Sequence, residues 1–432
     1  MPTRRAYGLL AFLTLLNILG FADRSLLAGF SLPVIRDLKM SYAQFSFLSG
    51  VAFIGFNSVS LLLMGYLADR VHRPRLIAAG MFVWSAMTAL SGLTRSFGQM
   101  AVARALVGIG EAGLAPSSLG LLSDVFPARR RGFVLGMFYV GPPVGVACSY
   151  FVAAILGPQL GWRTCFLLLG GLGVLLSSVL WFIREVRPTG PAPVMTSVAD
   201  GPAPAERGFR LLWMALRGSA ALRYLLLGAT FILFSIGATV LDIVWLVRER
   251  GFSEAGAQQT AGGLFLVGGL LGTFLGGIGS DWFSVRYRGG RALFLTVVYG
   301  LLGPASLAFR LLPAGHALFY PFMFIGCINI MLASGVPIAA ATELAPERIR
   351  STVIAFTILI TNVIGYSAGS FLVGWLSDTF TRQGYADPIS WADFWITVAS
   401  LPGIVCFYLS YRSQRVRTAR QPDSAALTNQ LT

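Results

Sequence analysis

The sequence predicts an all-α membrane protein with twelve transmembrane helices. Hydrophobic residues make up 55% of the 432 residues, charged residues make up 12%, and the mean hydropathy is +0.71, whereas a soluble domain carries about 25% charged residues. Apolar runs of about 20 residues return along the whole chain, and each is long enough to cross the ~30 Å hydrocarbon layer. Barrel strands need about 10 alternating residues, so helices are the spanning element. The composition excludes a soluble globular enzyme.

The apolar runs give twelve expected spans. These spans are residues 7–30, 43–67, 75–94, 98–122, 133–156, 164–183, 222–246, 258–280, 292–312, 316–341, 351–377 and 392–411.

Arginine clusters give the orientation of these spans. With both termini on one side, about 23 of the 33 basic residues fall on that side and about 8 on the other. Basic loops mark the cytoplasmic side, so we expect a multi-pass protein of the bacterial inner membrane with both termini in the cytoplasm. Cleavage of a signal peptide after residue 22 is the alternative, but it would place the termini on opposite sides. The net charge of +15 does not indicate a nucleic-acid partner, because the basic residues sit in short clusters between spans.

The chain divides into two halves at a polar segment. Residues 187–210 are rich in Pro, Gly and Ala and too polar to span, which is typical of a linker. We expect an N-terminal six-helix bundle (1–186), a cytoplasmic linker (187–221), a C-terminal six-helix bundle (222–411) and a cytoplasmic tail (412–432).

The two halves also carry similar charged residues at a fixed offset. The pairs that lie 219 residues apart are Asp23 with Asp242, Asp124 with Glu343, and Arg131 with Arg350. A shift of 212 residues relates Asp69 to Asp281. A parallel internal repeat of this kind places the substrate site between the halves.

No metal, cofactor or nucleotide site is expected. The four cysteines are scattered through apolar segments, without a Cys-x-x-Cys pair or neighbouring histidines. The sequence lacks a G-x-x-x-x-G-K-[ST] motif, so ATP is not the expected energy source. Both histidines, His72 and His316, fall in predicted loops. Any proton that crosses the membrane would therefore be carried by carboxylates.

A loop motif follows the second span. The segment reads GYLADRVHRPR from Gly65 to Arg75 and resembles the G-x-L-A-D-R-x-G-R-[KR] signature of the major facilitator superfamily, with His72 and Pro74 as departures. The resemblance implies a major facilitator fold of two six-helix bundles and a loop that takes part in conformational gating. A carboxylate at a helix end can pair with nearby arginines and hold one conformation; anchoring at the cytoplasmic surface is the alternative. The residues expected to gate are Asp69, Arg70, Arg73, Asp124, Arg131, Asp281, Glu343 and Arg350.

The fifth span contains a double proline. Gly141-Pro-Pro-Val-Gly145 is similar to the G-P-x-x-G core of the antiporter-associated signature of the same superfamily. Two consecutive prolines remove two helix donors and permit a bend, so a structural kink explains this stretch better than antiport does.

Two further stretches narrow the resemblance. The first span carries Asn17 followed by Asp23-Arg24, and the fourth span reads RALVGIGEA from Arg104. Both look like spinster-type members, whose signatures are N-x(4,5)-D-R and R-x-L-V-G-x-G-E-A. Anion and sugar-acid symporters of the superfamily also share an Asp-Arg pair and a Gly-x-Gly-Glu-Ala stretch, so they remain the competing branch.

Four charged residues are expected inside the membrane, namely Asp23, Arg24, Arg104 and Glu111. Each costs about 2.5–3.5 kcal/mol on insertion scales unless it faces a cavity or a partner. Counting ~1.5 Å per residue allows a contact between Asp23 and Arg104 and leaves Glu111 as the less compensated carboxylate. Glu111 is therefore expected to carry a proton, and the resemblance to spinster-type members implies a part in proton coupling for Asp23 as well. Arg24 is expected to bind an anionic head group, because a guanidinium holds two oxygens at once. A charge network that only fixes helix packing is the alternative.

Polar side chains in other spans complete the expected substrate site. They are Asn17, Arg104, Asn329, Thr361, Asn362 and Tyr366, although such groups also bond to neighbouring helices. We expect a monomeric transporter, not an enzyme, that moves a small organic or amphiphilic anion, such as a lysophospholipid-like lipid, by proton-coupled alternating access. The alternative is a proton-coupled symporter of sugar acids or of aromatic and other organic acids.

Overall fold

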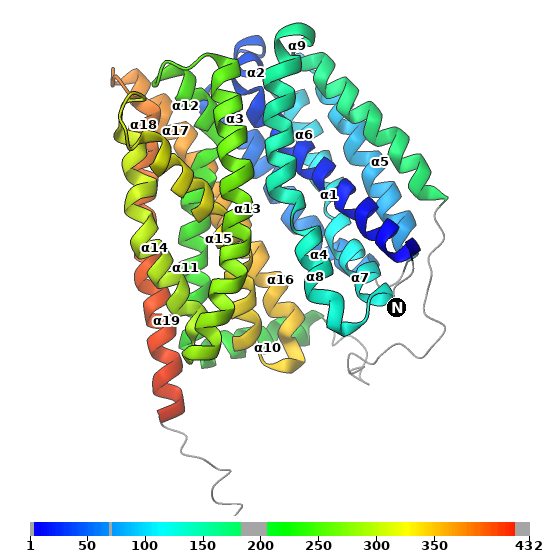
Figure 1. Ribbon diagram of the computed structural model, residues 1–432, viewed down its shortest axis with the longest axis vertical. Coiled ribbons are helices and arrows are strands. Elements are labelled where there is room, and N and C mark those ends of the chain that lie inside the picture. Colours follow the sequence, from blue (N-terminus) through cyan, green and yellow to red (C-terminus); the bar gives the residue numbers. More distant parts are fainter. Residues whose placement is uncertain (1–3, 69–70, 183–204, 420–432) are drawn as a thin grey trace, which may run out of the picture.

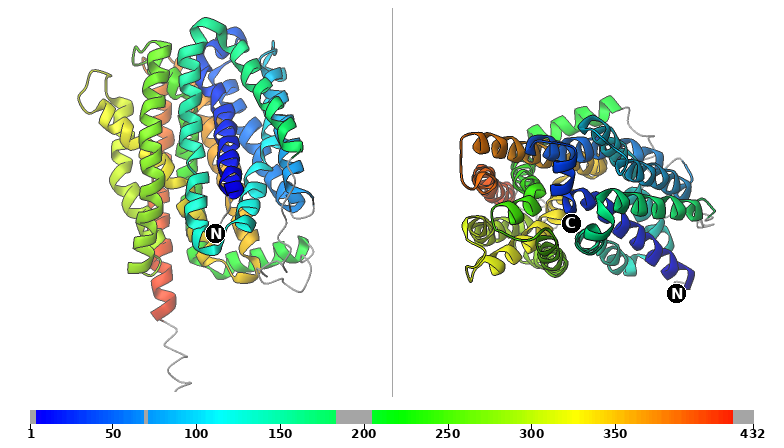
Figure 2. Two further views of the ribbon diagram at one scale, coloured as in Figure 1. Left: turned by 45° about the vertical axis from the view of Figure 1, so that its right-hand side comes forward. Right: turned by 90° about the horizontal axis from the view of Figure 1, so that it is seen from above.

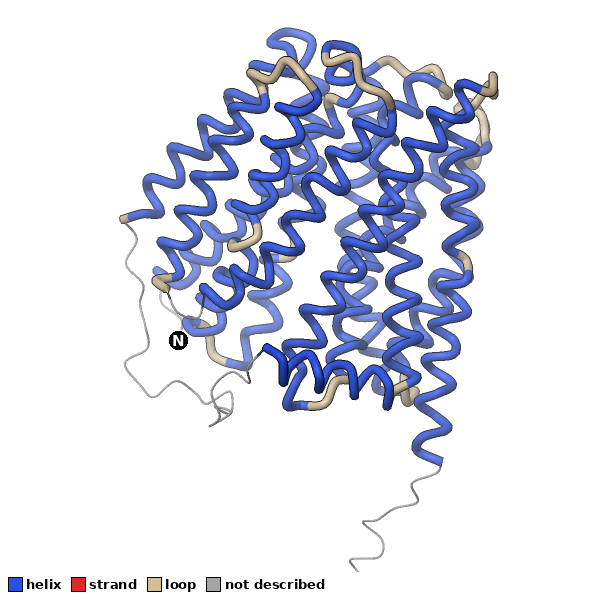
Figure 3. The backbone as a smooth tube through the Cα atoms, turned by 180° about the vertical axis from the view of Figure 1, so that it is seen from behind, coloured by secondary structure: helices blue, strands red, loops and turns tan. Residues whose placement is uncertain are grey.

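The computed structural model describes residues 4–68, 71–182 and 205–419. Every element of these residues is helical (Figures 1 and 3). The first half contains α1 (Arg4–Gly29), α2 (Ser31–Asp37), α3 (Tyr42–Phe47), the π-helical η1 (Leu48–Gly55), α4 (Phe56–Ala68), α5 (Arg73–Ser91), α6 (Phe97–Glu111), α7 (Leu114–Val125), α8 (Ala128–Phe138) and α9 (Gly141–Trp181).

The second half has a similar series of helices. It contains α10 (Ala205–Gly218), α11 (Ala220–Gly237), η2 (Ala238–Leu241), α12 (Asp242–Arg248), α13 (Glu254–Arg286), α14 (Gly290–Ala308), η3 (Phe309–Leu311), α15 (Phe319–Leu344), η4 (Glu347–Ile349), α16 (Arg350–Ile360), the π-helical η5 (Thr361–Ser367), α17 (Ala368–Arg382), α18 (Pro388–Ser400) and α19 (Pro402–Ala419).

Ten helical stretches of the described chain are long and apolar enough to cross a membrane. One of them, Gly132–Trp181, holds two expected spans, because the chain reverses at Gly161 with a φ of 72°, which glycine adopts without steric cost. α5 is less apolar but packs along α6 and α9. Together these account for the twelve expected spans, and the all-α membrane fold is confirmed.

The helices form two bundles that lie side by side (Figures 1 and 2). In the first bundle α9 packs along α1 and α5, and in the second α15 packs along α13 and α14. We call the end that carries α2, α12 and the turn at Gly161 the distal end, and the end that carries the N-terminus and α10 the proximal end (Figure 1). Part of the expected linker, residues 187–204, lies outside the described residues, and residues 205–218 form α10 across the proximal end of the second bundle (Figure 3).

The helix of the fifth span is interrupted just before the double proline. α8 ends at Phe138 and α9 begins at Gly141, so that the two prolines occupy the first turn of α9, where no intrahelical hydrogen bond is lost. The side-chain amide of Asn17 donates to the carbonyl oxygen of Phe138 at 2.8 Å. Asn17 of α1 thus provides a hydrogen-bond donor for the last residue of α8, at the interruption between α8 and α9.

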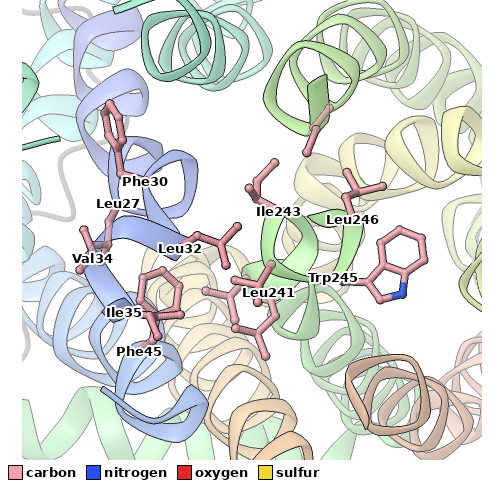
Figure 4. Packing of buried hydrophobic residues seen from close by; sticks show 14 of the residues in the cluster. Leu27, Phe30, Leu32, Val34, Ile35, Phe45, Leu241, Ile243, Trp245 and Leu246 are labelled. Carbon is pink, nitrogen blue, oxygen red and sulfur yellow. The ribbon is translucent and has the colours of Figure 1, made fainter. Parts of the chain in front are cut away.

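Apolar side chains join the bundles at the distal end. Leu32 and Ile35 of α2 belong to the same buried cluster as Leu241 of η2 and Ile243 of α12 (Figure 4). Burial of one such side chain stabilises by about 1.5–3 kcal/mol. The cluster therefore holds the two halves together at this end.

Hydrogen bonds between the bundles reinforce this contact. The carboxylate of Asp378 in α17 accepts hydrogen bonds from the main-chain N–H groups of Tyr42 and Ala43, at 3.0 and 2.9 Å. These N–H groups lie in the first turn of α3, where main-chain N–H groups have no partner within the helix. The helix dipole also makes a negatively charged partner favourable at this end. Gln258 of α13 also donates to the carbonyl of Gly29 at 2.7 Å. Opening the distal end would break these bonds.

Replacing Asp378 by Ala is expected to shift the population toward a state that is open at the distal end, because the first turn of α3 loses two hydrogen bonds to a charged group, each worth about 1.5–3 kcal/mol. Spin labels at positions 95 and 382 report the distance between the distal ends by double electron–electron resonance. Thr379→Ala is the matched control, since its hydroxyl bonds within α17 to Trp375. Identical distance distributions in Asp378→Ala and wild type would disprove the contribution of Asp378 to closure.

Two π-helical segments face each other across the bundle interface. η1 interrupts the second span and η5 interrupts the eleventh, and the two segments are in contact. Such segments inside helices frequently mark functional positions. η1 also carries Phe53, whose ring lies next to the guanidinium groups of Arg24 and Arg104.

Candidate functional site

An ion pair forms the centre of the candidate site. Nη2 of Arg24 in α1 lies 3.0 Å from Oε1 of Glu111 at the end of α6. The Glu111 side chain is 6% exposed, whereas 28% of the Arg24 side chain remains exposed. The guanidinium also lies 4.6 Å from the ring centre of Phe21 and 4.9 Å from that of Phe53. Arg24 is thus held by a carboxylate and two rings but keeps an accessible surface.

Asp23 and Arg104 lie beside this pair. The hydroxyl of Thr88 in α5 lies 2.6 Å from both carboxylate oxygens of Asp23, and its single O–H donates to this carboxylate. Arg104 is 1% exposed and donates from Nη2 to the main-chain carbonyl of Arg24 at 3.1 Å, while its Nε and Nη1 have no hydrogen-bond partner within the described part of the chain. Arg104 therefore adds an incompletely satisfied positive charge behind Arg24.

One expectation about this cluster is wrong. Glu111 is not the less compensated carboxylate, because Arg24 pairs with it. Asp23 bonds to the hydroxyl of Thr88 and lies within electrostatic range of Arg104. Asp23 and Arg24 are consecutive and point about 100° apart around α1, so one reaches α5 and the other α6. Counting residues along a helix gave their depth but not the neighbour that each side chain meets.

The glycines of the fourth span explain how α6 is positioned. A Cβ atom on Gly108 would lie 3.2 Å from the main-chain nitrogen of Asn57, and one on Gly110 would lie 2.8 Å from that of Trp84. Small residues permit such close helix packing in membranes. Gly108 and Gly110 thus let α6 approach the second and third spans, while Glu111 points to α1.

Two of the expected substrate residues bond to main-chain carbonyls. The amide of Asn17, which is 5% exposed, is engaged by Phe138. The hydroxyl of Thr361 donates to the carbonyl of Thr357 at 2.8 Å. Both side chains are therefore satisfied inside the protein.

The remaining substrate candidates of the second half divide between two places. Asn362 and Tyr366 are half-buried on η5. Tyr366 packs against the apolar core of the first bundle and lies within electrostatic range of Arg24. Asn329 lies in a cavity inside the second bundle. Of these three, the structure brings Tyr366 to the Arg24 cluster.

The second bundle has its own buried charge cluster. Nη2 of Arg310 lies 2.6 Å from Oδ1 of Asp242, and its Nε lies 3.1 Å from Oδ2 of Asp393. The guanidinium also lies 4.8 Å from the ring centre of Trp245. Sequence reasoning missed Arg310 and Asp393, although both fall inside predicted spans, which is the signal that identifies them.

The gating candidates form one ion pair system in each half. Arg73 lies 2.6 Å from Asp124, and Arg291 lies 2.7 Å from Asp281 and 3.1 Å from Glu343. Both arginines occupy the first turn of a helix, α5 and α14. The internal repeat is thus visible in the charges at the proximal end, and Arg291 is a member that sequence reasoning missed.

The other gating candidates are placed differently. Arg350 lies 3.9 Å from the exposed Glu347, three residues before it in the chain. Asp69 and Arg70 lie outside the described residues, as does the side chain of Arg131.

Comparison with known proteins places the chain in a family. The model of the Major Facilitator Superfamily matches residues 13–369. An "MFS-type efflux pump" of Mycolicibacterium smegmatis is 28% identical, over 96% of this chain and 96% of its own. "Protein spinster homolog 1" of Homo sapiens is 29% identical over 88% of this chain and 75% of its own. "Sphingosine-1-phosphate transporter SPNS2" of Danio rerio is 26% identical over 89% and 78%.

A solved structure shows the same fold. A bacterial homolog of the human lysosomal transporter spinster, in an inward-facing and unoccupied conformation, matches 96% of this chain and 98% of its own with a TM-score of 0.80 and 24% identity. The chain therefore belongs to the major facilitator superfamily, and its resemblance to the spinster-type members is confirmed.

Proposed function

We propose that this protein is a secondary active transporter that moves a small organic or amphiphilic anion by proton-coupled alternating access. The observation that carries the proposal is the ion pair between the partly exposed Arg24 and the buried Glu111. Relatives of the chain are transporters, so transport itself follows from the family. The coupling and the substrate class follow from the chemistry of this pair.

Arg24 has two competing partners in this mechanism. Glu111 holds Nη2 of the guanidinium, and an anionic head group needs the same donors for bidentate binding. A proton on Glu111 removes the negative charge that holds Arg24. The guanidinium then becomes available to a carboxylate or phosphate, so proton binding and anion binding favour each other. Asp23, which is buried beside Thr88, is the second candidate for a proton.

The contacts of the polar residues favour an amphiphilic anion over a hydrophilic acid. A sugar acid needs several hydrogen-bonding side chains that converge on its site, but Asn17 and Thr361 already bond to main-chain carbonyls. Two phenylalanine rings flank Arg24 instead. One relative bears the name of a sphingosine-1-phosphate transporter, and this substrate has a phosphate head on an apolar chain. A lysophospholipid-like anion therefore fits the site best.

Alternating access follows from the position of the contacts between the halves. Asp378 and the apolar cluster around Leu32 hold the distal end closed, while Arg73–Asp124 and Arg291–Glu343 each lie within one half. We place the termini in the cytoplasm of a bacterial cell and treat the protein as a monomer. In this orientation the distal end faces the outside of the cell and is closed. Rocking of the two bundles would open the distal end and close the proximal end.

The Arg24→Ala variant is expected to bind the anion at least about tenfold more weakly, a difference of ~1.4 kcal/mol, and Arg24→Lys is expected to recover part of the loss by keeping the charge. Thermal stabilisation of the purified protein by lysophosphatidic acid, glucuronate and benzoate at two pH values measures this effect, since a bound ligand raises the melting temperature. Equal affinities in all three proteins would refute the role of Arg24. Stabilisation by glucuronate or benzoate alone would favour the symporter of small organic acids.

A further inference from the structure

The second bundle contains a cavity that the proposed transport mechanism does not use. It has a volume of about 100 Å³ and lies between α11, α14, α15 and the helices α18 and α19. Most of its wall is apolar, with Ile232, Ile236, Met323 and Ile404 among the lining residues. Sites for small ligands combine apolar walls with a few polar groups, and a cavity needs only about 10–15 Å³ of such volume to hold one water molecule. This cavity therefore has the composition of a ligand site and room for a small ligand with a slender alkyl chain.

One part of the cavity wall carries a surplus of negative charge. Asp242, Arg310 and Asp393 all line the cavity, and the two carboxylates share a single guanidinium. Arg310 and Asp393 are buried, whereas 23% of the Asp242 side chain is exposed. A buried cluster with one uncompensated charge is costly. A cationic group bound beside Asp242 would compensate it.

Neighbouring charges do not remove this surplus. Arg250 lies 3.5 Å from Asp387 and donates its remaining hydrogen bonds to main-chain carbonyls and to Ser390. Glu249 accepts hydrogen bonds from the main-chain N–H of Ile389 at 2.6 Å and from that of Ser390 at 2.9 Å. Neither Arg250 nor Glu249 lines the cavity. The cavity itself therefore presents two acidic groups and one basic group.

A buried amide adds a second, independent indication of a ligand. Asn329 lines the cavity and is 8% exposed, and its Oδ1 has no hydrogen-bond partner among the residues that the structure describes. Its Nδ2 is paired with the hydroxyl of Ser306 at 3.4 Å. An unsatisfied buried acceptor costs about 1–3 kcal/mol. This wall therefore lacks a donor, as the Asp242 cluster lacks a positive charge.

We propose that this cavity binds a small amphiphile with a protonated amine head group. An ammonium group carries one positive charge and three donors, and these are the two properties that the wall lacks. The alkyl part of the ligand lies against the apolar residues of α11, α15 and α19. The head-group preference is opposite to that of the Arg24 site, and all residues that line the cavity belong to the second bundle, so we treat the cavity as a distinct site. It is a neighbour of the proposed anion path, because Tyr366 lies within electrostatic range of both Arg24 and Asp242.

Two glycines of α14 give a matched pair of variants. Gly303 lines the cavity, and a Cβ atom there would meet no other atom within 4 Å, so Gly303→Leu fills the cavity without a clash at its backbone. Gly300 lies on an exposed part of the same helix, and a Cβ atom there also meets nothing within 4 Å. Gly300→Leu therefore makes the same chemical change outside the cavity.

The test measures the thermal stability of the full chain in lipid nanodiscs with octylamine, octanol or octanoate. Octylamine is expected to raise the melting temperature of the wild type and of Gly300→Leu, to have no such effect on Gly303→Leu, and to bind at least about tenfold more weakly to Asp242→Asn. Octanol and octanoate are expected to stabilise less than octylamine.

Three results would overturn the proposal. Equal stabilisation by octanol would show an apolar cavity without charge recognition, a preference for octanoate would show the opposite selectivity, and an octylamine effect that survives in Gly303→Leu would place binding elsewhere. If Asp242→Asn does not fold, the glycine pair and the three ligands still decide. The Arg24 variants test the anion site separately, so failure of one site leaves the other standing.

Discussion

Glu111→Gln is expected to abolish proton-driven accumulation of the substrate and to leave the protein folded. Glutamine has nearly the size of a protonated glutamate but cannot change its charge, so it can neither form an ion pair with Arg24 nor take up a proton. We therefore expect the variant to reach the same substrate level with a pH gradient as without one. Uptake into proteoliposomes with and without an imposed pH gradient measures it.

Substrate exchange without a gradient separates this prediction from a general loss of function. Exchange needs binding and alternating access but no net proton movement, so Glu111→Gln is expected to retain it. Glu347→Gln is the matched control, because 92% of that side chain is exposed. A Glu111→Gln protein that still accumulates substrate with the pH dependence of the wild type would remove Glu111 from the coupling mechanism.

The competition between Glu111 and the anion also predicts effects of opposite sign. Loss of the charge on Glu111 frees Arg24, so the variant is expected to bind the anion more tightly, whereas Arg24→Ala binds it more weakly. A charge network that serves only to pack helices predicts something different. In that case both substitutions would lower stability, and neither would change affinity in a fixed direction. The pair of variants therefore distinguishes coupling from packing.

Local sequence was sufficient for the fold, because apolar length determines which segments cross the membrane. The double proline likewise indicated the interruption of the helix before Gly141. The neighbours of Arg24 were not predictable in the same way. Rotation of α1 and α6 about their axes, set by packing at Gly108 and Gly110, decides that Arg24 meets Glu111. Such packing involves residues far apart in the sequence.

The internal repeat predicted positions better than partners. It relates Asp124 to Glu343, and the structure pairs each of them with an arginine in the first turn of a helix. The arginine of the second half, Arg291, is one of several basic residues in a loop cluster. Its distance in sequence from Arg73 therefore does not distinguish it from its neighbours. A charge inside a predicted span is a stronger signal, and Arg310 and Asp393 could have been found by it.

Arg310→Met is expected to destabilise the protein by about 3–5 kcal/mol, the cost of removing one partner from a buried ion pair. Asp242 and Asp393 would remain in the second bundle without their counter-charge. The loss is expected to be larger at pH 8 than at pH 5, because a protonated carboxyl group carries no charge to compensate. Thermal unfolding in nanodiscs at both pH values measures the change, with the exposed Arg382→Met as control.

A combined variant tests the cause of this destabilisation. Arg310→Met with Asp242→Asn and Asp393→Asn leaves no charge in the cluster, and it is expected to recover most of the lost stability, since a neutral replacement of a buried ion network is often tolerated. If the combined variant were as unstable as Arg310→Met, lost packing of the long side chain against Trp245 would be the cause instead. If Arg310→Met were as stable as the wild type, the two carboxylates would need no positive charge, and the reason for an amine in the adjacent cavity would disappear with it.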